Sequence, residues 1–222
     1  MTGRPVLYVL AGVNGAGKSS IGGYRLRQAG LDWFNPDTFA RELVASTGCG
    51  QAEANALAWQ EGMRRFDDAI AGRAAYAFET TLGGRTVPAK IAEAARTHDV
   101  LMWFCGLSSP AKHVARVKAR VLAGGHDIPE AKIRERYVSA LENLVALMPS
   151  IAFLQVYDNS VDVARGESIP DPILLAEIAG GTLVRPTDLA ALRLTPEWAK
   201  PVLAAAMPGW SHTSLRGSRP AR

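Results

Sequence analysis

The chain has 222 residues, of which 48% are hydrophobic and 21% are charged, so it fits one folded domain with additions. These values exclude a large multidomain assembly and a wholly disordered chain. The 25 Lys and Arg residues give a net charge of +4 over 21 Asp and Glu, but Arg216, Arg219 and Arg222 supply three of these charges. A basic surface for nucleic acid is therefore not indicated, and we do not expect nucleic acid as a partner.

Cysteine content and hydropathy indicate the compartment. Cys49 and Cys105 lie far apart and have no metal-binding spacing, which is typical of a reducing cytoplasm. The longest apolar run, at 100–105, is much shorter than the roughly 20 residues needed to cross a bilayer. The early apolar stretch runs into a glycine-rich turn and has no cleavage site, so we interpret it as a strand. We expect a cytoplasmic protein that does not bind a membrane.

Short apolar runs alternate with longer helical patterns along the chain. Strands are predicted at 6–11, 33–35, 76–80, 100–106 and 152–157. Helices are predicted at 18–29, 37–47, 51–73, 86–97, 109–122, 129–148 and 196–207. This alternation predicts an α/β fold with a mostly parallel five-stranded sheet and helices on both faces.

The pattern changes after the fifth predicted strand. Residues 161–185 contain short extended segments broken by Gly and Pro, and a hairpin is predicted around Gly180 and Gly181. We expect three parts: a core at 1–160, an extension packed on it at 161–210, and a disordered tail at 211–222.

The strongest motif follows the first predicted strand, where residues 12–19 read G-V-N-G-A-G-K-S and match the P-loop pattern G-x-x-x-x-G-K-[ST]. Glycines let backbone N–H groups converge on phosphate oxygens, and the next helix N-terminus adds positive charge. Lys18 is expected to reach the β- and γ-phosphates of ATP, and Ser19 to bind Mg²⁺. A glycine-rich turn with an exposed lysine is the less favoured interpretation. The loop residues assigned to the nucleotide are Gly12, Asn14, Gly15, Ala16, Gly17, Lys18, Ser19 and Ser20.

Motifs that the sequence lacks indicate which class of P-loop protein this is. No apolar run of the sequence ends in Asp-Glu, as an AAA-type ATPase requires, and no N-K-x-D and D-x-x-G pair indicates a GTPase. A small kinase is favoured, because its acidic residues come from the ends of neighbouring strands.

Carboxylates follow two predicted strands, with Asp37 in N-P-D and Glu79 in F-E-T-T-L-G-G. Ligands of an open α/β sheet bind at the carboxyl ends of its strands, so both should face the P-loop. Asp37 is a candidate general base for an acceptor hydroxyl, with a helix N-cap as the alternative. Glu79 is a candidate for a Mg²⁺-bound water or the acceptor, together with Thr80 and Thr81. A solvated strand end is the alternative for this group.

A third polar group surrounds the connection between the helices predicted at 109–122 and 129–148. Glycines between two helices are typical of a mobile lid, whose guanidinium groups would neutralise charge on the transferred phosphoryl group. Solvated helix faces are the alternative for each arginine, and an exposed or capping role is the alternative for the histidine. The residues concerned are Arg116, Arg120, Gly124, Gly125, His126, Arg134 and Arg136. After the fifth strand, Asn159 is a candidate for the rim of the adenine site or for a turn.

Together these motifs resemble the zeta-toxin family of P-loop kinases. The matching segments follow one order over residues 6–160: G-V-N-G-A-G-K-S, N-P-D, F-E-T-T-L, R-V-x-x-G-G-H-D-I-P-E-x-K-I-x-x-R-Y and Y-D-N-S. The resemblance implies a P-loop NTPase-type three-layer sandwich with a helical lid near 120–130. It also implies that ATP and Mg²⁺ are used to phosphorylate the 3′-hydroxyl of the sugar in UDP-N-acetylglucosamine, and that an antitoxin protein is a partner.

The same resemblance implies a role for each site residue. Lys18 and Ser19 bind phosphate and metal, Asp37 is the base, and Glu79 contacts the substrate and a water on the metal. Arg120 and Arg136 are the lid arginines that we select from the four. Two alternatives stay open: a kinase for an antibiotic, another sugar or a nucleic-acid end, and a regulatory module that holds ATP without transferring phosphate. Such a module would need the P-loop but would have no use for Asp37.

Overall fold

The computed structural model describes residues 3–18, 22, 26, 30–163 and 170–207. Most of the helix predicted at 18–29, including Ser19 and Ser20, lies outside the described residues, as does the tail predicted at 211–222.

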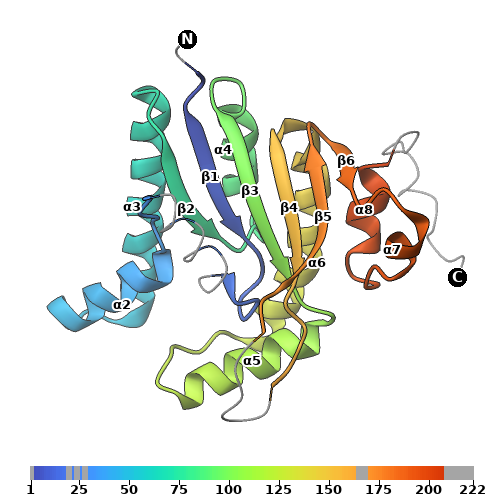
Figure 1. Cartoon of the computed structure of the whole chain (residues 1–222). Coiled ribbons are helices and arrows are strands. Elements are labelled where there is room, and N and C mark those ends of the chain that lie inside the picture. Colours follow the sequence, from blue (N-terminus) through green and yellow to red (C-terminus); the bar gives the residue numbers. More distant parts are fainter. Residues whose placement is uncertain (1–2, 19–21, 23–25, 27–29, 164–169, 208–222) are drawn as a thin grey trace, which may run out of the picture.

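A six-stranded sheet forms the centre of the molecule, in the order β2-β1-β3-β4-β5-β6 (Figure 1). The first four strands are parallel, and β5 and β6 are antiparallel additions at one edge. The predicted α/β fold with a mostly parallel sheet is confirmed. The strands are β1 (Val6–Ala11), β2 (Tyr76–Thr80), β3 (Asp99–Gly106), β4 (Phe153–Asp158), β5 (Ile173–Ala179) and β6 (Thr182–Arg185).

The number of strands differs from the predicted five for two reasons. Residues 33–35 form only an isolated bridge, from Phe34 to Phe78, because Pro36 begins a helix directly afterwards. The hairpin predicted around Gly180 and Gly181 supplies β5 and β6, which extend the sheet beyond β4.

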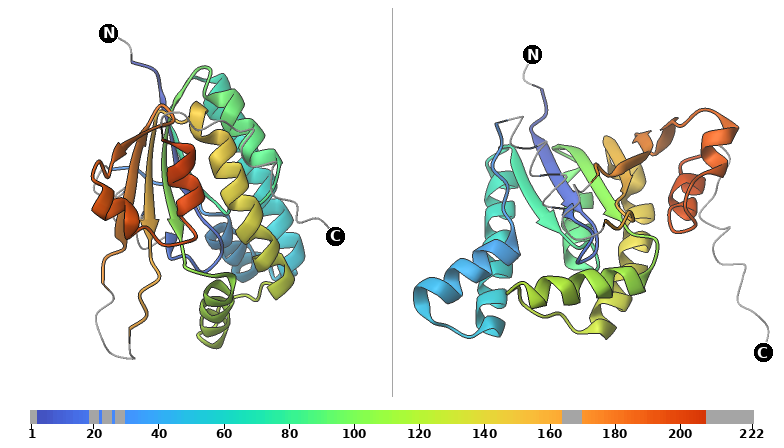
Figure 2. Two further views of the ribbon diagram at one scale, coloured as in Figure 1. Left: turned by 90° about the vertical axis from the view of Figure 1, so that its right-hand side faces the viewer. Right: turned by 60° about the horizontal axis from the view of Figure 1, so that its bottom comes forward.

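Helices α3, α4 and α6 lie on one face of the sheet, whereas α5 lies below its lower edge (Figure 2). The short helix α8 packs against α6 near the antiparallel edge. Most predicted helices match these elements to within a few residues, but 196–207 contains only α8, and α7 was not predicted. The helices are α2 (Pro36–Thr47), α3 (Gln51–Ala71), α4 (Thr86–Ala94), α5 (Pro110–Leu122), α6 (Glu130–Leu147), α7 (Leu189–Arg193) and α8 (Lys200–Ala205), with a 3-10 turn η1 at Met148–Ser150.

Alternating strand residues make two apolar layers, because successive side chains point to opposite faces. One layer includes Val9, Phe104 and Val156, and the other includes Cys105 and Tyr157. Trp198 and the buried residues of α8 join the first layer, so the chain after β6 contributes to the main core. Within the described residues, no helix is long and apolar enough to span a membrane.

Candidate active site

The P-loop connects β1 to a helix that begins at Lys18. Gly12, Gly15 and Gly17 have φ values of 142°, 82° and 82°, which other L-residues rarely adopt. At Gly12 a Cβ atom would lie 2.2 Å from the carbonyl oxygen of Cys105, so the first turn of the loop requires glycine there. The loop therefore approaches β3 closely.

The predicted meeting of strand ends is present in the structure. Lys18 Nζ lies 3.4 Å from Glu79 Oε1, and only 7% and 10% of these side chains are exposed. The other carboxylate oxygen of Glu79 accepts a hydrogen bond from Asn35 Nδ2 at 2.9 Å. Glu79 thus connects the P-loop lysine to the segment that carries Asp37.

Asn35, and not Asp37, caps helix α2. Asn35 Oδ1 accepts hydrogen bonds from the backbone N–H groups of Asp37, at 2.9 Å, and Thr38, at 3.2 Å. The N-cap alternative for Asp37 is therefore wrong, because the preceding Asn already satisfies these donors. The Asp37 carboxylate is half exposed and faces the lid, with Oδ2 3.8 Å from Arg120 Nη1 and Oδ1 3.9 Å from His126 Nε2.

The four candidate arginines divide into two pairs. Arg120 contacts Asp37, and its Nη2 donates to the carbonyl of His126 at 3.1 Å, whereas Arg136 Nη1 donates to Asn14 Oδ1 of the P-loop at 2.8 Å. Burial lowers the pKa of Arg136, although Asp37 acts in the opposite direction.

The other two arginines are engaged elsewhere. Arg116 donates to the Val161 carbonyl at 2.9 Å, and Arg134 pairs with Glu130 at 2.7 Å on the exposed surface of α6. The role of Arg120 and Arg136 as lid arginines stays a prediction, and Arg134, with its partner on the surface of α6, supplies a natural control.

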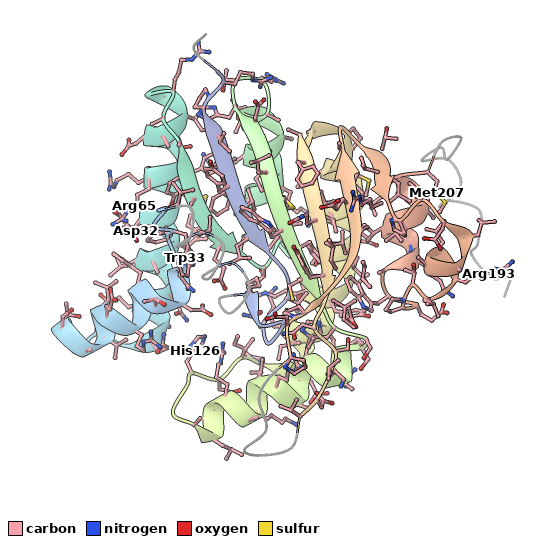
Figure 3. The ribbon with its side chains drawn as sticks, viewed as in Figure 1. Asp32, Trp33, Arg65, His126, Arg193 and Met207 are labelled. Carbon is pink, nitrogen blue, oxygen red and sulfur yellow. The ribbon has the colours of Figure 1, made fainter. Side chains whose placement is uncertain are left out.

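Lys18, Asp37, Glu79 and Arg136 line a cleft of about 730 Å³. Thr80 and Thr81 also line this cleft. The Thr80 hydroxyl oxygen accepts a hydrogen bond from the backbone N–H of Leu82 at 3.1 Å, and that of Thr81 accepts one from Gly83 at 3.4 Å. His126 belongs to the lid connection that borders the cleft on the side toward α2 (Figure 3).

Sequence reasoning missed one wall of the cleft, which comes from α3. Ala58, Trp59, Gly62 and Met63 line it, and Trp59 is 51% exposed. A cleft lined by apolar residues as well as by carboxylates and cations suits an acceptor with both apolar and charged parts. The sequence signal that could have indicated this wall is Trp59, a large aromatic residue within an otherwise ordinary amphipathic helix.

Two further residues, which do not line the cleft, contact the backbone of the P-loop. His113 Nδ1 lies 2.8 Å from the backbone oxygen of Asn14, and Asn159 Nδ2 donates to the backbone oxygen of Ala16 at 2.9 Å. No local pattern around His113 indicated this contact. Asn159, the candidate for the adenine rim, is engaged with the loop backbone.

The donor set fits a nucleotide triphosphate. A loop with left-handed glycines, a nearly buried lysine and a helix start together make a site for phosphate oxygens. No group of three His, Cys, Asp or Glu in the described part of the chain could hold a metal ion by itself. A Mg²⁺ ion at this site would therefore depend on phosphate oxygens and on Ser19, which lies outside the described residues, with Glu79 nearby.

The burial of His113 predicts a pH dependence of stability. Burial lowers its pKa from 6.5 to about 4, so the folded protein holds a neutral ring where the unfolded chain binds a proton. Because the unfolded state binds more protons between these values, the free energy of unfolding should decrease as pH falls from 6.5 to 4, by about 3 kcal/mol in all. Denaturant unfolding at a series of pH values measures this change. The His113→Asn variant should show a shallower decrease, and equal slopes in the two proteins would contradict the assignment.

Comparison with known proteins tests the fold. No protein-family model matches the chain, and no curated protein matches it by sequence. Among solved structures, a chain of the AvrRxo1-ORF1:-ORF2 complex crystallised with ATP is similar, with a TM-score of 0.62 and 17% identity over 95% of this chain. The present chain spans 66% of the length of that protein.

A second similar structure comes from the PezAT chromosomal toxin–antitoxin system of the human pathogen Streptococcus pneumoniae. It gives a TM-score of 0.53 and 14% identity, over 97% of this chain and 82% of that chain. At these identities the likeness concerns the fold. The chain therefore has the P-loop NTPase-type fold expected from its resemblance to the zeta-toxin kinases.

Proposed function

We propose that the chain is an ATP-dependent kinase that phosphorylates a hydroxyl group of a small acceptor. The observation that carries this proposal is the chain of contacts from Lys18 through Glu79 and Asn35 to the segment of Asp37. It joins a P-loop to a carboxylate that faces the same cleft. A module that only holds ATP would need the P-loop but not the carboxylate of Asp37.

Each residue then has a chemical role. ATP supplies the phosphoryl group, with Mg²⁺ held through Ser19 and, via water, Glu79. Lys18 binds the β- and γ-phosphates, and Asp37 accepts the proton of the acceptor hydroxyl. Arg120 and Arg136 offset the negative charge that redistributes during transfer. Thr80, Thr81 and Glu79 contact the acceptor.

For the acceptor we propose the 3′-hydroxyl of the sugar in UDP-N-acetylglucosamine. The resemblance to the zeta-toxin motifs supports it, and so does the mixed apolar and charged wall of the cleft. Because similar structures are named as a complex of two proteins and a toxin–antitoxin system, we also propose an antitoxin protein as partner.

The test is transfer of labelled phosphate from ATP to a panel of acceptors, with UDP-N-acetylglucosamine first and antibiotics, other sugars and nucleic-acid ends after it. Transfer that is absent in Lys18→Ala supports the kinase, and the acceptor used identifies the substrate. ATP binding with no transfer to any acceptor would favour a regulatory module.

The lid arginines give a prediction of their own. Arg120→Ala should lower the turnover number by about 10²-fold or more, because a guanidinium beside Asp37 acts when charge moves in the transition state. The affinity for ATP should change much less. Arg134→Ala, on the same pair of helices but bonded to Glu130 at the surface, should behave like the parent enzyme. Steady-state kinetics and ATP titration separate the two effects, and equal losses of turnover and affinity would move Arg120 from catalysis to binding.

A further inference from the structure

Three side chains from three separate elements bond to backbone carbonyls of the P-loop. His113 on α5 lies 2.8 Å from the Asn14 oxygen, while Asn159 after β4 and Cys105 on β3 both donate to the Ala16 oxygen at 2.9 Å. None of the three lines the cleft. Their bonds are made to carbonyl oxygens, which do not bind phosphate, so a role as ligands of the phosphates does not explain these contacts.

The geometry of the peptide bond gives these contacts a consequence. In a trans peptide the carbonyl of one residue and the N–H of the next point in opposite directions. The only cis bond in the described part of the chain is at Arg185–Pro186, so the Asn14–Gly15 and Ala16–Gly17 peptides are trans. Because the carbonyls of Asn14 and Ala16 point toward these side chains, the N–H groups of Gly15 and Gly17 point away from them. Backbone N–H groups that point out of a loop in this way can form an anion-binding concavity.

Glycine at positions 15 and 17 leaves room for the residues that make these contacts. A Cβ atom at Gly17 would lie 2.4 Å from Asn159 Nδ2, and one at Gly15 would lie 3.0 Å from the His113 backbone oxygen. Both glycines also have φ values of 82°. The glycines of the motif thus permit the loop backbone to approach the very residues that orient it.

Each donor is in the protonation state that the contact requires. The His113 ring is 1% exposed and packs edge-on against Tyr137, with ring centroids 5.6 Å apart. A backbone oxygen can only accept, so Nδ1 carries the proton of the neutral ring. Burial raises the pKa of the Cys105 thiol to about 12, which keeps the proton that Sγ donates.

We propose that His113 and Asn159, supported by Cys105, are positioning residues that hold the P-loop in its anion-binding form before the nucleotide arrives. The inference rests on the proposed nucleotide site and goes beyond it, because it assigns phosphate affinity partly to residues that never touch phosphate. The contact of His113 with Asn14 connects the first half of α5 to the P-loop, and Arg120, near the other end of α5, lies close to Asp37.

The test compares variants that separate hydrogen bonding from packing. His113→Phe keeps an aromatic ring beside Tyr137 but removes the donor, whereas the amide nitrogen of His113→Asn can occupy the place of Nδ1. Affinity for ATP and for tripolyphosphate, which lacks adenosine, is measured by calorimetry. We expect His113→Phe to weaken both by about tenfold or more and His113→Asn to stay within about threefold of the parent protein.

The acceptor KM should stay near its parental value in all variants, which a general loss of structure would not allow. Asn159→Ala should weaken the binding of ATP and of tripolyphosphate in the same way. If His113→Phe does not fold, the result for Asn159→Ala tests the inference. Parental affinity in His113→Phe or Asn159→Ala would overturn the inference, as would an equal loss in His113→Asn and His113→Phe. A parent protein that binds neither ligand would instead refute the proposed function.

Discussion

Replacing Asp37 with Asn is expected to leave folding and ATP binding close to parental while lowering phosphate transfer by about 10²–10⁴-fold. The amide keeps the size of the side chain but cannot accept a proton from the acceptor hydroxyl. Asn35 already caps α2, so the substitution removes no capping bond. Thermal unfolding with and without Mg-ATP, followed by the transfer rate with the acceptor found in the screen, measures the three quantities.

Glu135→Gln is the matched control for this experiment. Glu135 also lines the cleft, but its carboxylate is exposed and pairs with Lys132 at 2.9 Å, so the Glu135→Gln variant should retain most of the turnover number. A stable Asp37→Asn protein that keeps more than about a tenth of the parental rate would exclude Asp37 as the base. Glu79 would then be the better candidate.

The parts of the site that the sequence predicted are those governed by short-range rules. The P-loop is a contiguous motif, and Asp37 and Glu79 follow from the rule that ligands meet the carboxyl ends of strands in an α/β sheet. The order of strands and helices likewise predicted the parallel sheet. The isolated bridge at Phe34 shows the limit of such rules, because the apolar run looked like a strand while Pro36 began a helix two residues later.

The parts that could not be predicted depend on contacts between distant residues. His113 is 99 positions from Asn14, and Asn159 is 143 positions from Ala16, so neither role has a local signature. The choice between Arg134 and Arg136 depended on which side of α6 faces the P-loop. In the structure Arg136 is on the side that faces the P-loop, where it donates to Asn14. Gly83 leaves space for it, because a Cβ atom at Gly83 would lie 2.6 Å from Arg136 Cγ.

Replacing Lys18 with Ala is expected to abolish measurable transfer, with a loss of at least about 10²-fold, and to weaken ATP binding strongly. Two causes act together. The phosphates lose the ammonium group that the P-loop provides, and the nearly buried carboxylate of Glu79 loses the lysine 3.4 Å away. Breaking such a pair from one side should also lower the free energy of unfolding by about 3 kcal/mol. ATP titration, transfer assays and denaturant unfolding report these effects separately.

The double variant Lys18→Ala with Glu79→Gln separates the two causes. Glutamine can still accept the hydrogen bond from Asn35 Nδ2, but it places no negative charge beside the phosphates. Stability should therefore recover most of the loss, and ATP affinity should recover in part, since only the electrostatic repulsion has been removed. Transfer should stay as low as in Lys18→Ala, because the cation that acts on the transferred group is still missing. Recovery of transfer in the double variant would show that Lys18 serves only to neutralise Glu79, and that the phosphates are bound by other groups.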